Sequence, residues 1–530
     1  MKIQNQTNRI LGKDWVAYHP YSDTTFVDNY YISLCNKVLK IISQSELAAF
    51  LKDAKEEKML ACILTAYFED VISETRLFST FTRLHKKMYG KALPFYEITD
   101  DYYDDEINLR DIYFLIWYHA CVQDKEMVYD PYFENDASFN EAVTEIYNLF
   151  DSEFEKAPQN EKLQNFLILP VGSSATAVRE KLTFIAQKSF LWKAVYDMFF
   201  EEVLSEYKKN DTIVLDDIGQ KGIYDQQIYF IFSECLPLLS LRANEYYAAI
   251  LGEEHAEYQL IKNISKRIFG SFLLLKIENN GYLIEHYASG KKLFLSDEFT
   301  VFNNKHLIEN ESVLSLSLVH WNEDIWHMQG ACLVNKLHEL NAEDIKDHAF
   351  EDDKKKDFLV NFEKVFLEQT NGKRLVYMQG RKAFVEFYIK CFREYNKMID
   401  PEITDKELEE KYKNYEENRY NNLPFEKDEA VAVFFNPNSG VEIFRERIVA
   451  CMCDKNNPYY ANQEFDINDL LTIKSLSKEF VYYAIENDII KLCIQEYANP
   501  DMFHLIRENF DFLLRFFRRS DYFSKPSVSI

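Results

Sequence analysis

The spacing of apolar residues changes along the chain and divides it into regions of different predicted structure. From residue 29 to about residue 257 the apolar residues recur every three or four positions, which predicts a succession of amphipathic helices. Between Phe269 and Val334 the period shortens to two, which predicts strands. Helical spacing resumes from Asp344. The pattern predicts an α+β protein that is predominantly helical, with a small β module between helical regions.

The β module is predicted to contain five short strands. Two segments, Asn279-Asn280-Gly281 and Ser289-Gly290, supply residues that tolerate a positive φ in hairpin turns. Five short strands suggest an SH3-like or OB-like barrel, because closure removes exposed sheet edges. The predicted strands are residues 271–277, 282–287, 292–296, 313–321 and 325–334.

Turn signals and changes of composition predict four regions. These are an N-terminal helical domain (1–160), a second helical region (161–267), a small antiparallel barrel-like module (268–335) and a C-terminal α-rich domain (336–530). The last region includes a predicted β-hairpin at residues 430–445, with a turn at 436–440. Ser173 or Ser174 is placed to cap the helix that follows, because a serine hydroxyl accepts from free backbone N–H groups.

Composition and charge narrow the classes of function. The chain carries 61 basic and 87 acidic side chains, a net charge of −26, which repels a phosphate backbone. Nine scattered cysteines lie mostly in apolar runs and lack a four-ligand spacing, so we expect reduced core thiols and no zinc centre. The polar residues 1–14 predict no secretory signal, and no apolar run is long enough to span a bilayer. We therefore expect a cytoplasmic protein without a cofactor.

Short aromatic and acidic segments stand out within residues 1–120. They are Asp14-Trp15, His19-Pro20-Tyr21, Asp28, Tyr30-Tyr31, Tyr67-Phe68-Glu69-Asp70, Leu93-Pro94-Phe95-Tyr96 and Tyr102-Tyr103-Asp104-Asp105-Glu106-Ile107-Asn108. Together they resemble a bacterial family built on a domain of unknown function. The resemblance covers mainly the N-terminal quarter, with weaker similarity in the β module and around residues 434–440. It implies no activity, substrate or catalytic residue, so the chemistry stays open.

The first candidate site is a group of carboxylates in the N-terminal region, formed by Glu69, Asp70, Asp105, Glu106 and Asp111. A divalent metal or general acid–base chemistry would use such a group. The structural alternative is stronger. Asp104 or Asp105 can cap the helix that follows, Glu106 can pair with Arg110, and Arg76 or Arg83 can neutralise Glu69 or Asp70.

The second candidate site lies in the last hairpin of the β module. If residues 322–325 form the loop, Trp321 faces Trp326 across the two strands, and His320 lies opposite His327 on the other face. The indoles could hold an aromatic or sugar ligand, and the imidazoles could help to bind a metal. The alternative is that both indoles fill the barrel core.

These observations favour a non-enzymatic protein-interaction or scaffold protein with a protein partner of unknown identity. The alternative is a metal-assisted hydrolase or nuclease-like enzyme that uses the N-terminal carboxylates. A nucleic-acid-binding barrel is weaker, because residues 269–334 contain four lysines against eight acidic residues. Phosphate-binding loops, nucleophile elbows and Rossmann fingerprints are missing from the sequence.

Overall fold

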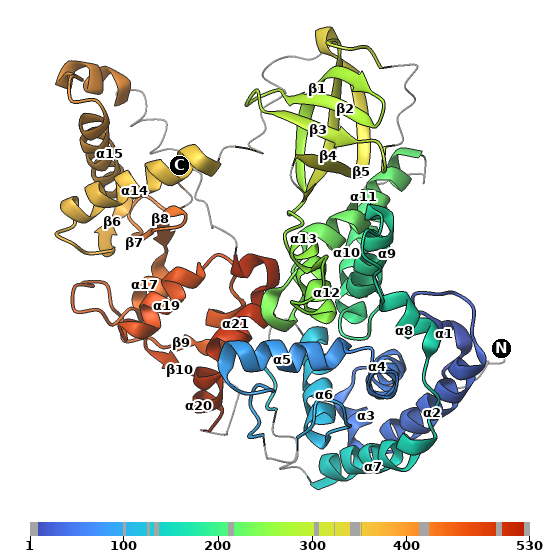
Figure 1. Cartoon of the computed structure of the whole chain (residues 1–530). Coiled ribbons are helices and arrows are strands. Elements are labelled where there is room, and N and C mark those ends of the chain that lie inside the picture. Colours follow the sequence, from blue (N-terminus) through green and yellow to red (C-terminus); the bar gives the residue numbers. More distant parts are fainter. Residues whose placement is uncertain are drawn as a thin grey trace. The chain divides into compact units, whose positions relative to one another are not determined.

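The computed structural model describes residues 9–98, 102–124, 128–131, 137–209, 217–300, 307–322, 324–339, 350, 352–412, 423, 425–493 and 501–523. Helices dominate, and the strands form a five-stranded sheet and smaller sheets (Figure 1). The predicted α+β class is therefore confirmed. The chain divides into two compact units: unit 1 comprises residues 1–349 and 508–520, and unit 2 comprises residues 350–507 and 521–530.

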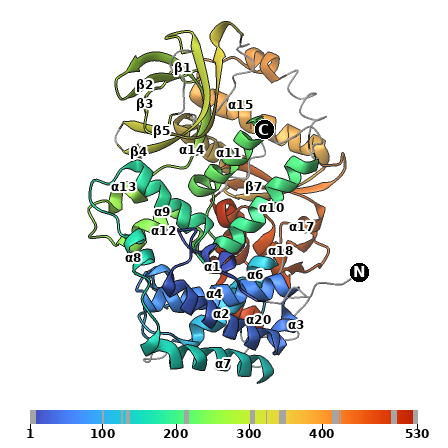
Figure 2. The same ribbon diagram turned by 90° about the vertical axis from the view of Figure 1, so that its right-hand side faces the viewer.

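The N-terminal helices of unit 1 surround α4 (Ala54–Ile72). Every residue of α4 from Leu60 to Asp70 is buried, as expected for a helix that is apolar on all sides. Its neighbours include α2 (Phe26–Ser43), α5 (Leu77–Tyr89) and α6 (Leu109–Gln123) (Figure 1). Helices α2 and α6 lie beside it in the second view as well (Figure 2). The other helices up to the β module are α1 (Gly12–Val16), α3 (Glu46–Phe50), α7 (Ala137–Glu153), η2 (Phe154–Lys156), α8 (Glu161–Leu167), α9 (Ala175–Gln187), α10 (Lys193–Lys209), α11 (Asp217–Ser233), η3 (Leu238–Ser240), α12 (Ala243–Leu251) and α13 (Tyr258–Lys262).

Side-chain caps fix the beginnings of several of these helices. Thr25 and Asp28 form a capping box at the start of α2, in which each side chain accepts a hydrogen bond from the backbone N–H of the other residue. Ser174 caps α9 by accepting from the backbone N–H of Ala177, as one of the two predicted alternatives. The cap predicted for α6 is wrong. Its first flanking residue is Asn108, and neither Asp104 nor Asp105 occupies that position.

The β module contains the five predicted strands, with ends shifted by at most three residues. They are β1 (Ile268–Glu278), β2 (Gly281–His286), β3 (Lys292–Ser296), β4 (Ser312–Asn322) and β5 (Ile325–Lys336). Each strand pairs with two others, so the sheet closes in the order β1-β2-β3-β5-β4. The β3–β5 pair is parallel and the other pairs are antiparallel. Helix α11 packs against β5.

The pairing of the last hairpin differs from the prediction. Trp321 does not face Trp326, and His320 does not face His327. Instead His320 pairs with Trp326 and Val319 pairs with His327, with an irregularity in register between His320 and Asn322. A bulge places two residues opposite one, so the extra residue shifts the register and exchanges the faces of the following side chains.

A helix near the end of the sequence completes the core of unit 1. Helix α21 (Phe510–Arg518) belongs to unit 1, although most of the residues before it belong to unit 2. The ring of Phe516 lies 5.0 Å from that of Trp117, and the ring of Phe512 lies 6.1 Å from it. The hydroxyl of Tyr89 donates to Asp511. The N-terminal helices therefore share their core with residues far away in the sequence.

Unit 2 is built around a three-stranded antiparallel sheet in the order β6-β7-β8. The predicted hairpin is confirmed as β7 (Ala430–Asn436) and β8 (Gly440–Phe444), whereas β6 (Leu375–Gln379) was not predicted. Apolar residues of α14 (Asp352–Gln369) and α15 (Gly380–Ile399) form one core with the sheet. The remaining elements are η5 (Leu337–Glu339) in unit 1, followed by α17 (Glu446–Cys451), β9 (Phe465–Asp466), α18 (Ile467–Thr472), α19 (Lys478–Glu486), β10 (Leu492–Cys493), α20 (Asp501–Glu508) and η6 (Arg519–Tyr522).

In the described part of the chain, none of the helices combines the length and hydropathy needed to cross a lipid bilayer. All nine cysteines are free, and six of them are buried.

Candidate functional site

A pocket of about 620 Å³ lies in unit 1, where the C-terminal end of α4 meets the N-terminal ends of α5 and α6. Of the predicted carboxylates, Asp70, Asp105, Glu106 and Asp111 line this pocket, and Glu69 does not. Glu69 and Asp70 diverge because successive side chains of an α-helix point about 100° apart. The acidic residues predicted as one group therefore belong to two clusters, which we call the acidic pocket and the buried triad.

Asp70 forms the inner wall of the acidic pocket and also caps α5. Its carboxylate accepts hydrogen bonds from the backbone N–H groups of Leu77 and Phe78, both at 2.8 Å, and from the hydroxyl of Thr75. The predicted neutralisation of Asp70 by Arg76 or Arg83 is therefore wrong, since its donors are neutral. Burial raises the pKa of Asp70 to about 6, against the opposing effect of these hydrogen bonds.

Asp111 lies in the first turn of α6 and is also buried. The hydroxyl of Tyr67 donates to one carboxylate oxygen at 2.6 Å, and the hydroxyl of Tyr102 donates to the other at 3.0 Å. The side-chain amide of Asn108 lies 3.3 Å from the first of these oxygens. Burial raises the pKa of Asp111 to about 7, although all three donors lower it. Asp111 thus holds two tyrosine hydroxyls at the pocket wall.

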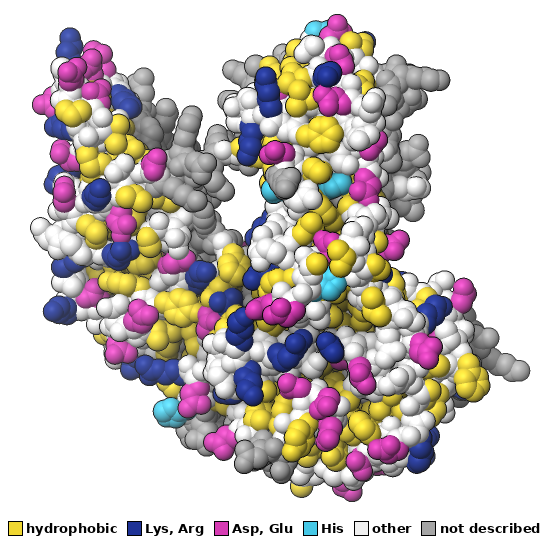
Figure 3. Space-filling view, viewed as in Figure 1, with side chains coloured by type: hydrophobic (Ala, Val, Ile, Leu, Met, Phe, Trp, Pro, Cys, Tyr) yellow, Lys and Arg dark blue, Asp and Glu magenta, His cyan; other side chains and the backbone are white. Residues whose placement is uncertain are grey.

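The rim of the acidic pocket is exposed and strongly negative. Seven acidic residues line the pocket against two arginines, Arg76 and Arg83. Among them Asp104, Asp105 and Glu106 are exposed. The acidic lining contrasts with the outer surface of α5, where basic side chains gather (Figure 3). Two further acidic residues, Asp100 and Asp101, precede Asp104 in the sequence and lie outside the described residues.

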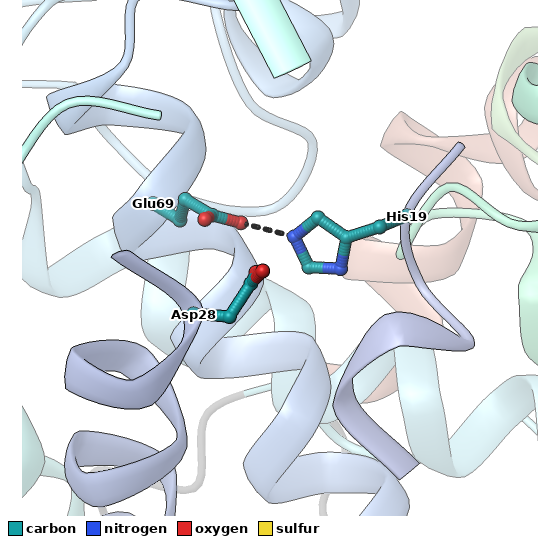
Figure 4. A group of neighbouring side chains, drawn as sticks. All are labelled: His19, Asp28 and Glu69. Atoms are coloured by element: carbon teal, nitrogen blue, oxygen red, sulfur yellow. Dashed lines mark hydrogen bonds and ion pairs between the residues drawn. The ribbon is translucent and has the colours of Figure 1, made fainter. Parts of the chain in front are cut away.

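The buried triad consists of His19, Asp28 and Glu69 (Figure 4). His19 lies just after α1, Asp28 lies in the first turn of α2, and Glu69 lies on α4. The Nε2 atom of His19 is 2.8 Å from Oε2 of Glu69. Burial lowers the pKa of His19, but the Glu69 carboxylate facing it raises the pKa, and the net direction is upward.

Neutral donors fix both carboxylates of the buried triad. The indole N–H of Trp15 and the hydroxyl of Tyr21 each donate to Oδ1 of Asp28 at 3.0 Å, and the backbone N–H of Thr25 donates to Oδ2. The side-chain amide of Asn160 donates to Oε1 of Glu69 at 2.9 Å. This arrangement is closed to solvent, so it cannot receive a substrate in the way that the acidic pocket can.

No pattern in the sequence marks His19 or Asp28 as functional residues. They stand 50 and 41 positions before Glu69, and no periodicity connects residues at such separations. The available signal was that all three residues occur in the short segments on which the family resemblance rests. The structure brings these segments together.

The four candidate residues of the β module also pair differently from the prediction. Trp321 and His327 are buried with their ring centroids 5.2 Å apart, while His320 and Trp326 are half-buried with centroids 4.9 Å apart. Burial lowers the pKa of His327. Each indole therefore contacts an imidazole, and neither the facing pair of indoles nor the facing pair of imidazoles is formed. A ligand or metal role for these four residues stays a prediction.

Among the comparisons with known proteins, one gave a match, and it covers the N-terminal half of the chain. A search of curated proteins found no match, and a search of solved structures found none. The resemblance to a family built on a domain of unknown function is confirmed. The matched region covers about half of the chain, whereas a quarter was predicted. The N-terminal half, residues 9–272, matches the model of the family described as "Protein of unknown function (DUF3843)".

Proposed function

We propose that the N-terminal half is a binding domain for a small, positively charged ligand, which enters the acidic pocket. The observation that carries this proposal is the lining of the pocket, with seven acidic residues against two arginines. Its volume of about 620 Å³ is in the range of small-molecule sites. An acidic pocket concentrates cations, because field lines converge in a concave surface of low dielectric constant.

The described contacts suggest a division of roles within the pocket. Asp105 and Glu106 are exposed, so they can meet an ammonium or guanidinium group directly. Asp111 already accepts from Tyr67 and Tyr102, so its role is to hold these hydroxyls in place. Asp70 caps α5 and keeps the wall of the pocket in position. The exposed carboxylates therefore provide the charge, and the buried ones provide the framework.

The predicted metal-assisted hydrolase is supported less well than ligand binding. Of its five candidate residues, Glu69 lies in the buried triad, apart from the four that line the pocket. Among the described residues, only His19, Asp28 and Glu69 form a group of three or more His, Cys, Asp or Glu side chains with ligand atoms within 4.8 Å of one another. The pocket carboxylates therefore lack the mutual spacing of a preformed metal centre.

The predicted protein-interaction role is the second candidate. One observation favours it: Phe269 on β1 and Leu333 on β5 are 61% and 64% exposed. Large apolar side chains on a sheet surface are available to a protein partner. We keep a bacterial cytoplasmic setting within this proposal, because of the family resemblance and the nine free cysteines.

A thermal-shift experiment tests the proposed binding domain. We expect agmatine and spermidine to raise the melting temperature of the wild type, and citrate to leave it unchanged. The double substitution Asp105→Asn and Glu106→Gln should abolish the rise. The matched control is Glu141→Gln with Glu145→Gln, which removes two exposed carboxylates of α7 that do not line the pocket. An equal rise in both double variants would contradict the proposal.

A further inference from the structure

We propose that His19, Asp28 and Glu69 form a buried binding site for a divalent transition-metal ion. The site is separate from the acidic pocket and does not depend on its function. One nitrogen ligand and two oxygen ligands come from three segments of unit 1, and their ligand atoms all lie within 4.8 Å of one another. Figure 4 shows the three side chains converging on one point between α2, α4 and the segment after α1.

The three groups lie close enough together for their side chains to close around one metal ion. Metal–nitrogen and metal–oxygen bonds of about 2.0–2.2 Å separate adjacent ligand atoms by about 3.0–3.4 Å. The distance from Nε2 of His19 to Oε2 of Glu69 is 2.8 Å, just below that range. The other separations do not exceed 4.8 Å. Side-chain rotations that bring the more distant ligand atoms closer by up to about 1.4 Å would therefore complete the ligand geometry.

The hydrogen bond on the far side of the imidazole requires a cation between His19 and Glu69. Nδ1 of His19 lies 3.0 Å from the backbone carbonyl oxygen of Trp15, which can only accept, so Nδ1 carries a proton. In the neutral imidazole Nε2 then presents a lone pair to the Glu69 carboxylate, and two acceptors at 2.8 Å repel each other. Either a proton or a metal ion must lie between them. A backbone carbonyl that receives Nδ1–H while Nε2 faces anionic ligands is the usual setting of a metal-binding histidine.

Charge balance favours the metal ion over the proton. The three side chains are 0–1% exposed. With a proton on Nε2 the triad carries two negative charges and one positive charge, and the excess charge is unfavourable in a buried site. A divalent ion with a neutral imidazole gives a net charge of zero. The donors from Trp15, Tyr21, Thr25 and Asn160 hold the carboxylates in position before the ion arrives.

The ligand set also limits the kind of ion and its role. One imidazole and two carboxylates suit zinc, manganese or iron better than calcium, which prefers oxygen ligands alone. Because the triad is closed to solvent, the ion cannot meet a substrate there. Its role is to tie α2 and α4 to the segment that carries His19, and it enters as unit 1 folds.

Metal analysis of the untagged protein tests the site. Wild-type protein purified without chelator is analysed by inductively coupled plasma mass spectrometry, and zinc or manganese is expected at a stoichiometric level. Glu69→Gln should lose the ion and keep the fold. The amide oxygen can still accept from Asn160, and the amide N–H can donate to a neutral imidazole. The double variant Glu141→Gln with Glu145→Gln is the control and should keep the ion.

Two further measurements decide the proposal if Glu69→Gln does not fold. Asp28→Asn should also lose the ion, and X-ray absorption of the wild type should show nitrogen and oxygen ligands with a single imidazole. Three results would overturn the site. These are wild-type protein that contains no metal and shows no thermal shift with zinc or manganese, equal metal content in wild type and Glu69→Gln, and sulfur among the ligands.

Discussion

Glu69 and Asp70 are neighbours on α4, yet their carboxylates lie in different surroundings. Glu69 faces the imidazole of His19 and the amide of Asn160 in a closed cluster. Asp70 faces a pocket and accepts only from a hydroxyl and two backbone N–H groups. One turn of one helix therefore serves both the buried triad and the acidic pocket.

The comparison shows that the partners of a carboxylate decide its role more than its position in the sequence. In the buried triad the polar groups contact one another, and water is excluded. In the acidic pocket the buried Asp70 and Asp111 have neutral donors, so burial raises their pKa values, while the rim carboxylates remain in water. The first arrangement suits stability, and the second suits reversible binding of a cation.

The largest effect should come from breaking the buried triad. We expect Glu69→Ala to lower the free energy of unfolding of unit 1 by about 3–5 kcal/mol. The substitution removes the carboxylate that neutralises the buried cation held beside His19. Urea unfolding followed by tryptophan fluorescence measures this change. All five tryptophans (Trp15, Trp117, Trp192, Trp321 and Trp326) lie in unit 1, so the signal reports that unit alone. A loss below about 1 kcal/mol, as for a surface pair, would refute this view of the triad.

Removing the carboxylate of Asp70 should have a smaller effect. Asp70→Ala deprives the backbone N–H groups of Leu77 and Phe78 of their acceptor at the start of α5. We expect a loss of about 1–3 kcal/mol in the same urea experiment. Asp70→Asn should recover part of the loss, because its amide oxygen can still accept. If Asp70→Ala unfolded at the wild-type urea concentration, the capping role would be wrong.

Asp111 should make the stability of unit 1 depend on pH. Its pKa rises on folding from the ordinary 3.8 to about 7, so between these values the folded protein holds a proton that the unfolded chain has lost. The contribution of Asp111 to stability therefore falls as pH rises through this window, by up to about 1.4 kcal/mol per pH unit, and is constant above it.

The variant Asp111→Asn isolates this contribution. Urea unfolding of wild type and Asp111→Asn at pH 5, 6, 7 and 8 gives the difference in stability at each pH. The difference should change between pH 5 and 7 and level off by pH 8. Glu145→Gln, an exposed carboxylate of α7, is the control and should give a constant difference. A constant difference for Asp111→Asn as well would show that its pKa is not raised.

The smallest effect on stability should come from the rim of the acidic pocket. Asp105 and Glu106 are exposed, so we expect Asp105→Asn with Glu106→Gln to change the free energy of unfolding by no more than about 0.5 kcal/mol. Urea unfolding measures this change. A large loss of stability would mean that these residues support the fold, and the comparison between rim and framework would then fail.

The sequence predicted the fold where local spacing carries the information. The shift in apolar period near residue 270 located all five strands of the β module, because a strand alternates its faces whatever it pairs with. The hairpin at β7 and β8 was recognised from its turn. Strand β6 was missed because a five-residue apolar run beside a helix carries no period of its own.

The sites were less predictable, because they depend on contacts between distant residues. The bulge between His320 and Asn322 leaves no mark in the composition, yet it brings Trp321 to the same face as His327 and pairs His320 with Trp326. The sequence predicted the carboxylates of the acidic pocket as candidates. It did not predict that Glu69 lies apart from them. His19 and Asp28 could not be joined to Glu69, because only the packing of α2 against α4 brings these segments together.

Isothermal titration of agmatine into three proteins tests the central claim most directly. These proteins are the wild type, Glu69→Gln and the double variant Asp105→Asn with Glu106→Gln. The account predicts that agmatine binds to the wild type and to Glu69→Gln with similar affinity, and at least about tenfold more weakly to the rim variant. Unchanged affinity in the rim variant, or loss of binding in a folded Glu69→Gln alone, would contradict the separation of a binding pocket from a structural triad.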